Sequence, residues 1–142
     1  PYKESGKIYK ELISISPHTR YIALYYDNPY KVLPSERRYL VGALLSESNE
    51  SIDKDLLNKL KQSGYSEWDF PTVDNALNTQ FPYKNTLSIY LSAWRVYTAI
   101  TKFIEANKID VGPCIEVWDN DIVYYMCPLD HKEQFYVKEI NP

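Results

Sequence analysis

The sequence predicts an α+β fold in which helices pack on one side of an antiparallel sheet. Three observations support this class. Residues 85–107 place apolar side chains at helical spacing around much of a helix. Residues 110–129 have the pattern of a β-hairpin, with two arms rich in Tyr and β-branched residues on either side of a polar turn. The order helix, strand, strand occurs in both halves of the chain, so the halves share a pattern of elements.

The composition is that of a single globular domain. The chain has 142 residues, enough for one hydrophobic core, and 14 Tyr, whose large apolar rings carry polar tips. A net charge of −3 and the lack of a basic run argue against direct nucleic-acid binding. The two Cys and two His do not match a zinc spacing, so we expect no metal and no cofactor.

The first third of the chain predicts a helix followed by two strands. Residues 5–15 show the spacing of a short amphipathic helix. Residues 19–27 form a strand pattern rich in Tyr, which Pro29 limits, and residues 37–45 form a second strand pattern. This part of the chain therefore contributes one helix and one pair of strands.

The middle of the chain predicts a second helix and two shorter strands. Residues 51–64 have an apolar stripe at helical spacing, with Asp53 near the start and Gly64 as the stop. Residues 65–70 have the composition of a short strand, and another strand lies within residues 72–82.

The longest predicted helix spans residues 85–107, and Asn85 or Thr86 can cap its start. Its predicted polar face is narrow and consists of Ser88, Ser92, Arg95, Lys102 and Glu105. Because apolar side chains occupy the remaining circumference, we expect this helix to be largely buried across the sheet.

The hairpin carries a single carboxylate within its first arm, Glu116, with Trp118 on the same face two residues later. If the chain turns over Asn120, opposite residue numbers sum to about 241. Glu116 then faces Tyr125, and Trp118 faces Val123. The register therefore predicts an acid beside two aromatic rings.

Glu116 has two interpretations. It is either a solvated carboxylate on a strand face or an acid held beside aromatic rings. Burial would raise its pKa and make an unpaired anion costly, so that a bound cation would be favoured. Aromatic faces add about 0.5–2 kcal/mol to cation binding. A raised pKa would equally allow Glu116 to act as a general acid or base.

The aromatic candidates for a site around Glu116 could each belong to the core instead. They are Tyr25, Tyr26, Trp94, Tyr97, Trp118 and Tyr125. The register favours Trp118 and Tyr125. Only one of Tyr25 and Tyr26 can point inward, because neighbouring strand residues face opposite sides. Covering the sheet is an alternative role for Trp94.

The same register places Cys114 opposite Cys127. A cross-strand disulfide is then geometrically possible. Two reduced thiols are the alternative, and they are the usual state in the cytosol.

Several segments together resemble a known family. They are ISISPHTRYIALYYDNP, VGALLSESNES, GYSEWDFP, QFPYKNTLSIYLSAWRVY, CIEVWDNDIVYYMCPL and QFYV. Their order and spacing, from about Tyr2 to Val137, resemble the GyrI-like (SHS2-type) ligand-binding domain. Within that family they are most similar to the domain of animal ER-phagy (reticulophagy) receptors.

The resemblance implies a pseudo-duplicated pair of β-α-β-β units with a ligand groove between them. The first strand of the family would precede Pro1. GyrI-like drug sensors bind hydrophobic cations through a groove acid at the position of Glu116, and some relatives hydrolyse cyclopropane-bearing compounds. Relatives with a second acid carry it at the position of Tyr124, so a two-acid mechanism does not carry over.

For the receptors, the resemblance implies a longer protein in the endoplasmic reticulum membrane. An N-terminal helix would anchor it, this domain would face the cytosol, and a C-terminal tail would bind autophagy proteins and an unfoldase. Three functions follow as hypotheses. The first is binding of a small hydrophobic or cationic ligand, and the second is hydrolysis of strained cyclopropane toxins with Glu116 as general acid or base. The third is a protein-interaction domain whose groove is vestigial.

Overall fold

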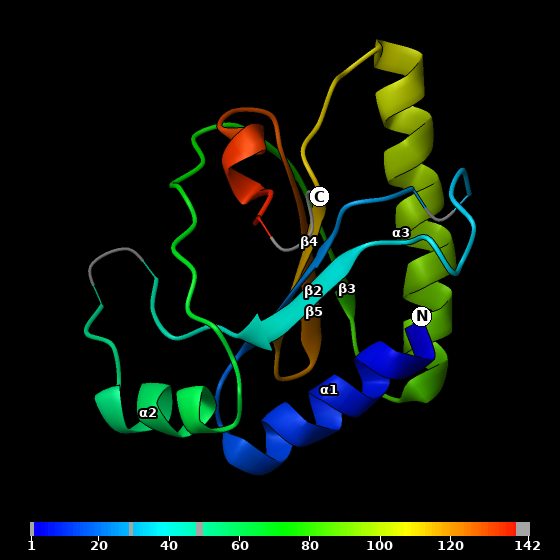
Figure 1. Ribbon diagram of the computed structural model, residues 1–142. Helices are drawn as coiled ribbons and strands as arrows, with labels where there is room; N and C mark the ends of the chain where they lie inside the picture. The colour runs from blue at the N-terminus through cyan, green and yellow to red at the C-terminus, as the bar shows by residue number, and fades with distance from the viewer. Residues whose placement is uncertain (1, 29, 48–49, 139–142) are drawn as a thin grey trace.

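The computed structural model describes residues 2–28, 30–47 and 50–138, and contains a five-stranded antiparallel sheet of order β2-β1-β4-β5-β3 (Figure 1). The elements in chain order are α1 (Tyr2–Ile15), β1 (Tyr21–Tyr25), β2 (Tyr39–Ala43), α2 (Lys54–Gln62), β3 (Ala76–Pro82), α3 (Thr86–Asn107), β4 (Cys114–Asp119), β5 (Ile122–Pro128) and the 3₁₀ turn η1 (Lys132–Phe135). The predicted α+β class is confirmed.

The three α-helices pack on one face of the sheet, which we call the helix face. Leu12 of α1 and Leu60 of α2 share a buried cluster with Ala23 of β1. Val96 of α3 packs against Tyr125 of β5 in a second cluster. On the opposite face, the loop before β3 and η1 cover Leu24 and Ile115, whereas Tyr124 of β5 stays 41% exposed.

The order of elements repeats within the sheet. α1 is followed by the antiparallel pair β1 and β2, and α3 by the antiparallel pair β4 and β5. β1 and β4, the first strand of each pair, lie side by side at the centre of the sheet. β3 precedes α3 and pairs with β5, which completes one β-α-β-β unit.

The ends of α2 and α3 follow the predicted signals. The Asp53 side chain accepts hydrogen bonds from the backbone N–H groups of Asp55 and Leu56, and Gly64 after the helix has φ of +88°, a conformation that favours glycine. Asn85 caps α3 through a reciprocal pair of bonds with Ser88. These caps satisfy backbone groups that the first turn of a helix leaves unpaired.

The predicted strand at residues 65–70 is wrong. This segment has no strand pairing in the structure, and its end, Phe70, packs on the sheet face opposite the helices. Phe70 stacks on Phe135 with ring centroids 5.3 Å apart. Of its aromatic residues, only Phe70 packs on this face, whereas Tyr65 packs against the helix-face cluster and Trp68 is 39% exposed.

The expectation that α3 is largely buried is also wrong. Its buried residues are Ser92, Val96 and Ile100, and Ser92, expected on the polar face, is only 4% exposed. Tyr90 and Trp94 are 70% and 66% exposed. One narrow stripe of α3 packs on the sheet, so the remaining apolar residues of its first half face solvent.

Candidate functional site

Glu116 lies at the centre of the helix face. It is on β4, the middle strand of the sheet, with Ala23 opposite it on β1 and Tyr125 opposite it on β5. The predicted register, including the Trp118–Val123 pair, is confirmed. Only 6% of Glu116 is exposed, because α1 and α3 pack over this part of the sheet.

Two neutral donors hold the Glu116 carboxylate. The Tyr97 hydroxyl donates a hydrogen bond of 2.7 Å to Oε1, and the Trp118 indole N–H donates one of 3.2 Å to Oε2. No ion pair of Glu116 occurs among the described residues. Burial raises the pKa of Glu116 to about 7, although both hydrogen bonds act to lower it.

Aromatic rings surround this carboxylate. Tyr97 meets Tyr125 edge to face with ring centroids 6.0 Å apart, and it meets Tyr25 in the same way at 6.3 Å. Of the six predicted aromatic residues, Trp118, Tyr125, Tyr97 and Tyr25 therefore lie around Glu116 or beside its neighbours. As predicted, only one of Tyr25 and Tyr26 points toward the site, and that residue is Tyr25.

The other two predicted residues lie elsewhere. Tyr26 is on the opposite face of the sheet, where its hydroxyl donates a 2.8 Å hydrogen bond to the Phe135 carbonyl. Trp94 is exposed and does not cover the sheet. Tyr124 is on the face away from Glu116 and is 41% exposed, so it adds nothing to the site.

Two further rings were missed by the sequence reasoning. Tyr9 of α1 lies 5.7 Å from Trp118 between ring centroids, and Tyr83, just after β3, lies 5.2 Å from it. Burial, followed by the nearby charge of Glu116, raises the pKa of Tyr9 well above its ordinary range. The spacing of Ser5, Tyr9 and Leu12 on one side of the first helix was the available signal for Tyr9.

The Tyr9 hydroxyl is buried and makes no hydrogen bond of normal geometry among the described residues. Buried polar groups are normally paired, and leaving one unpaired costs free energy. Within the described part of the chain, the site therefore contains a buried carboxylate without an ion pair and a buried hydroxyl whose nearest polar neighbour is the Trp118 indole.

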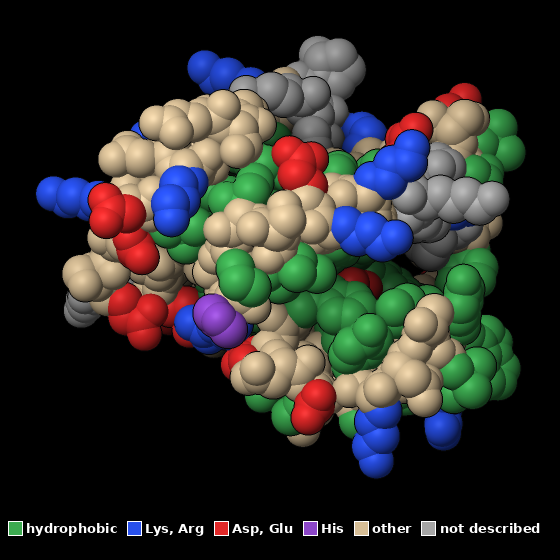
Figure 2. All heavy atoms as spheres, turned by 90° about the horizontal axis from the view of Figure 1, so that it is seen from below, with side chains coloured by type: hydrophobic (Ala, Val, Ile, Leu, Met, Phe, Trp, Pro, Cys, Tyr) green, Lys and Arg blue, Asp and Glu red, His purple; other side chains and the backbone are tan. Residues whose placement is uncertain are grey.

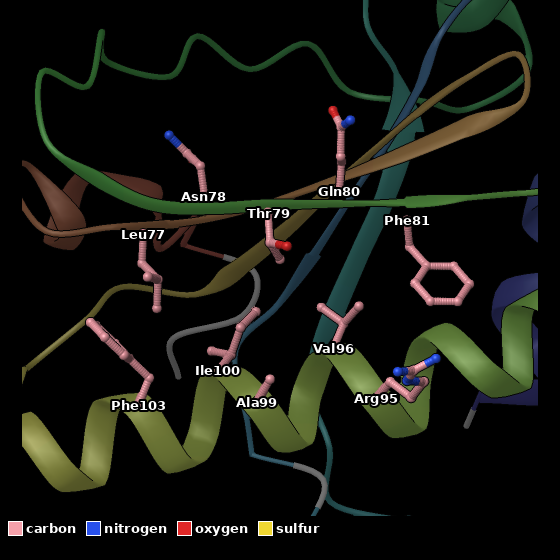
Figure 3. A pocket seen from close by; sticks show the side chains of 10 residues that line it. All are labelled: Leu77, Asn78, Thr79, Gln80, Phe81, Arg95, Val96, Ala99, Ile100 and Phe103. Carbon is pink, nitrogen blue, oxygen red and sulfur yellow. The ribbon is translucent and has the colours of Figure 1, made fainter.

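A hollow of about 520 Å³ lies away from Glu116, between β3 and α3 (Figure 3). Leu77, Thr79 and Phe81 point from β3 toward the helix, and Phe103 points back from α3. The residues that line this hollow include no carboxylate, so it does not match the acidic groove that the family resemblance implies.

The first half of α3 presents an apolar surface to solvent. We call it the α3 patch, and it consists of Leu87, Tyr90, Leu91 and Trp94. Figure 2 views the molecule from the end at which α3 begins and shows hydrophobic side chains gathered over one side of that face. Contiguous exposed apolar surface of this kind is typical of interaction sites.

Neither a metal site nor a membrane span is present within the part of the chain that the structure describes. No group of three or more His, Cys, Asp and Glu side chains gathers there to hold a metal ion. None of the described helices has the length and apolarity needed to cross a bilayer.

Comparison with known proteins gives one relationship. Over 140 residues the chain is 38% identical to testis-expressed protein 264 of Homo sapiens and 37% identical to its homolog in Mus musculus. The matches cover 99% of this chain and 45% of each relative, so the chain spans about half the length of the curated relatives it matches. No family model and no solved structure matches it. The chain is homologous to the matched 45% of testis-expressed protein 264.

Proposed function

We propose that this domain binds a small hydrophobic or cationic ligand between α1 and α3, with Glu116 as the anionic anchor. The observation that carries the proposal is a buried carboxylate held by neutral donors inside a group of aromatic rings. A charge removed from water without a counter-ion is costly, and a bound cation would relieve that cost. Ring faces would add cation–π attraction.

The rings that surround Glu116 define how such a ligand would enter. Tyr9 comes from α1, Trp118 from β4 and Tyr97 from α3. Because Glu116 is buried beneath them, these side chains must turn aside as the ligand enters. A flat or lipophilic cation would then replace their contacts with the carboxylate.

A thermal-shift measurement tests this function. The probes are tetraphenylphosphonium, a lipophilic cation, and triphenylphosphine oxide, a neutral aromatic compound of similar size. A ligand at 100 times its Kd stabilises a protein by about 2.7 kcal/mol. We expect the cation to raise the Tm of the wild type and not that of Glu116→Gln. Equal shifts in both proteins, or no shift in either, would contradict the proposal.

A protein-interaction domain is the second candidate, and the α3 patch favours it. Trp and Tyr are enriched where interfaces gain most of their binding energy. Under this function the rings around Glu116 are simply core, and neither probe shifts either protein. The double variant Tyr90→Ser/Trp94→Ser would then lose a specific partner that the wild type and Glu116→Gln both retain.

We further propose that the domain is the cytosolic part of an ER-phagy receptor. This proposal rests on the family resemblance, and the homology with testis-expressed protein 264 over 140 residues is consistent with it. A full-length protein should then localise to the endoplasmic reticulum membrane with this domain accessible to protease from the cytosolic side. Protection of the domain in sealed microsomes would contradict the proposed orientation.

A further inference from the structure

Cys114 and Cys127 occupy directly opposed positions on the two strands that carry the Glu116 site. Extending the confirmed register of β4 and β5 by one residue beyond the Ile115–Met126 pair joins the two cysteines. Both side chains lie on the helix face, in the cluster that contains Val96 and Tyr125. Both are free thiols.

The backbone pairing gives these positions a geometry suited to a disulfide. The Pro128 carbonyl accepts a 2.8 Å hydrogen bond from Gly112 on the β4 side, and the Leu129 N–H donates one of 2.9 Å to Asn75 on the β3 side. Because successive residues of a strand turn their polar groups to alternate sides, those of Cys127 face β3. Cys114 and Cys127 are thus a non-hydrogen-bonded pair, for which Cα atoms lie about 4.5 Å apart. Disulfides span about 4.4–6.8 Å between Cα atoms.

The two thiols also differ in accessibility and interact with each other. Cys127 is only 1% exposed, whereas Cys114 is partly exposed. The interaction of the two side chains raises the pKa of Cys114 and lowers the pKa of Cys127, so acidity favours Cys127 as the nucleophile and only accessibility favours Cys114. Cys114 is therefore the thiol that a dissolved oxidant meets first, and Cys127 lies in place to react next.

We propose that Cys114 and Cys127 are a redox modification site that closes to a cross-strand disulfide by exchange with glutathione disulfide. No movement of the backbone is needed, because the strands already hold the two residues opposite each other. Disulfides that do form in a reducing compartment such as the cytosol are usually transient and redox-sensing rather than permanent.

The chemistry consists of two thiol–disulfide exchanges. The Cys114 sulfur attacks glutathione disulfide, the S–S bond of that molecule breaks, and one glutathione leaves with the Cys114 proton. The Cys127 sulfur then attacks the Cys114 sulfur of the mixed disulfide, and the second glutathione leaves with the Cys127 proton. In total two protein thiols are oxidised to one disulfide, and one glutathione disulfide is reduced to two glutathiones.

Oxidation of the two cysteines would change the contacts of Tyr97 at the Glu116 site. The Cys114 side chain lies beside the hydroxyl of Tyr97, which is the donor to Oε1 of Glu116. A disulfide removes the Cys114 proton and draws its sulfur toward β5. The modification itself does not depend on whether Glu116 binds a ligand, so the two proposals can fail separately.

The test equilibrates the folded chain in glutathione buffers of increasing oxidised fraction, alkylates free thiols after an acid quench, and measures intact mass. We expect one transition, from a species with two alkyl groups to a species with none that has lost two hydrogen atoms. A wild type that keeps both thiols in the most oxidising buffer would overturn the proposal. So would stable glutathione adducts or a covalent dimer.

Single variants assign the order of reaction. Cys127→Ala lacks the second thiol, so it should accumulate one glutathione on Cys114. Cys114→Ala should remain unmodified, because Cys127 is buried. The reverse pattern would overturn the assignment of Cys114 as the first thiol. Circular dichroism shows whether each variant is folded. Where a Cys→Ala variant does not fold, the corresponding Cys→Ser variant replaces it.

Discussion

The Tyr97 hydroxyl donates a 2.7 Å hydrogen bond to Oε1 of Glu116, linking the middle of α3 to the central strand of the sheet. The bond favours the ionised carboxylate, whereas burial favours the protonated one. Burial has the larger effect, and the pKa of Glu116 is raised to about 7. The protonation state of the site therefore changes near neutral pH.

The first prediction concerns the pH dependence of stability. The pKa of Glu116 rises from 4.5 to about 7 on folding, so the folded state holds a proton that the unfolded state has lost. The stabilisation that comes from this retained proton is fully present below about pH 4.5 and is lost as the pH rises to about 7. Over this range the free energy of unfolding should fall by about 3 kcal/mol. Urea unfolding of the wild type between pH 5 and 8 should show this decline.

Glu116→Gln is the matched control, because it keeps the shape of the side chain and cannot ionise. Its free energy of unfolding should lack this decline, and at pH 8 it should exceed that of the wild type. A variant that declines as steeply as the wild type would show that Glu116 is not the titrating group.

The second prediction concerns the effect of the Tyr97 hydroxyl on the ionisation of Glu116. Tyr97→Phe keeps the ring and removes the hydroxyl, so it should raise the pKa of Glu116 further. Hydrogen bonds to charged groups contribute about 1.5–3 kcal/mol and neutral ones about 1 kcal/mol. The loss of unfolding free energy should therefore be larger at pH 8 than at pH 5. The same loss at both pH values would mean that Tyr97 does not act on the charge.

Tyr125→Phe provides the comparison for this experiment. The Tyr125 hydroxyl lies beside Ser92, a neutral residue, and is not one of the two donors to Glu116, so its removal should change the pH dependence less than Tyr97→Phe does. Measuring both Tyr→Phe variants by urea unfolding distinguishes a direct effect on Glu116 from a general loss of packing under α3.

The hairpin was the most predictable part of the structure. The turn at Asn120 fixes which residues oppose each other, and a period of two then assigns every side chain to a face. Glu116, Trp118 and Tyr125 were therefore placed correctly from the sequence. Local patterning sufficed because both strands lie in the same short stretch of chain.

Contacts between distant segments could not be predicted in this way. Tyr9 reaches Trp118 only because α1 packs on the helix face of the sheet, which no local pattern encodes. Trp94 and Ser92 were misplaced because hydrophobicity identifies α3 as a helix but does not say which stripe meets the sheet. Helical patterning gives the faces of a helix, and only tertiary packing selects the buried one.

The third prediction compares two residues of α3. Trp94 is 66% exposed and Ile100 is 8% exposed. Trp94→Ala should change the free energy of unfolding by no more than about 0.5 kcal/mol, as expected at the surface. Ile100→Ala should cost about 2–5 kcal/mol, because it leaves a cavity against β5. Chemical denaturation measures both, and similar losses would show that Trp94 is buried in solution.

The fourth prediction concerns the join between β1 and β2. Asp27 accepts hydrogen bonds from the Arg38 backbone N–H at 2.6 Å and from the Arg38 guanidinium at 2.8 and 3.1 Å. The side-chain hydrogen bond from Arg38 is the main cause that lowers the pKa of Asp27. Asp27→Asn removes the charge and should cost about 1–2 kcal/mol at pH 7, because Arg38 is 39% exposed and solvent screens the pair.

This loss should depend on pH in the opposite sense to that of Glu116. A lowered pKa stabilises the folded state above the ordinary value of 3.8, and the stabilisation is lost as pH falls below it. The difference between the wild type and Asp27→Asn should therefore narrow below about pH 4. Glu47→Gln breaks a more exposed pair with Arg20 and should cost less than about 1 kcal/mol at pH 7. If both variants lose the same free energy, the bonds from Arg38 to Asp27 add nothing beyond an ordinary surface ion pair.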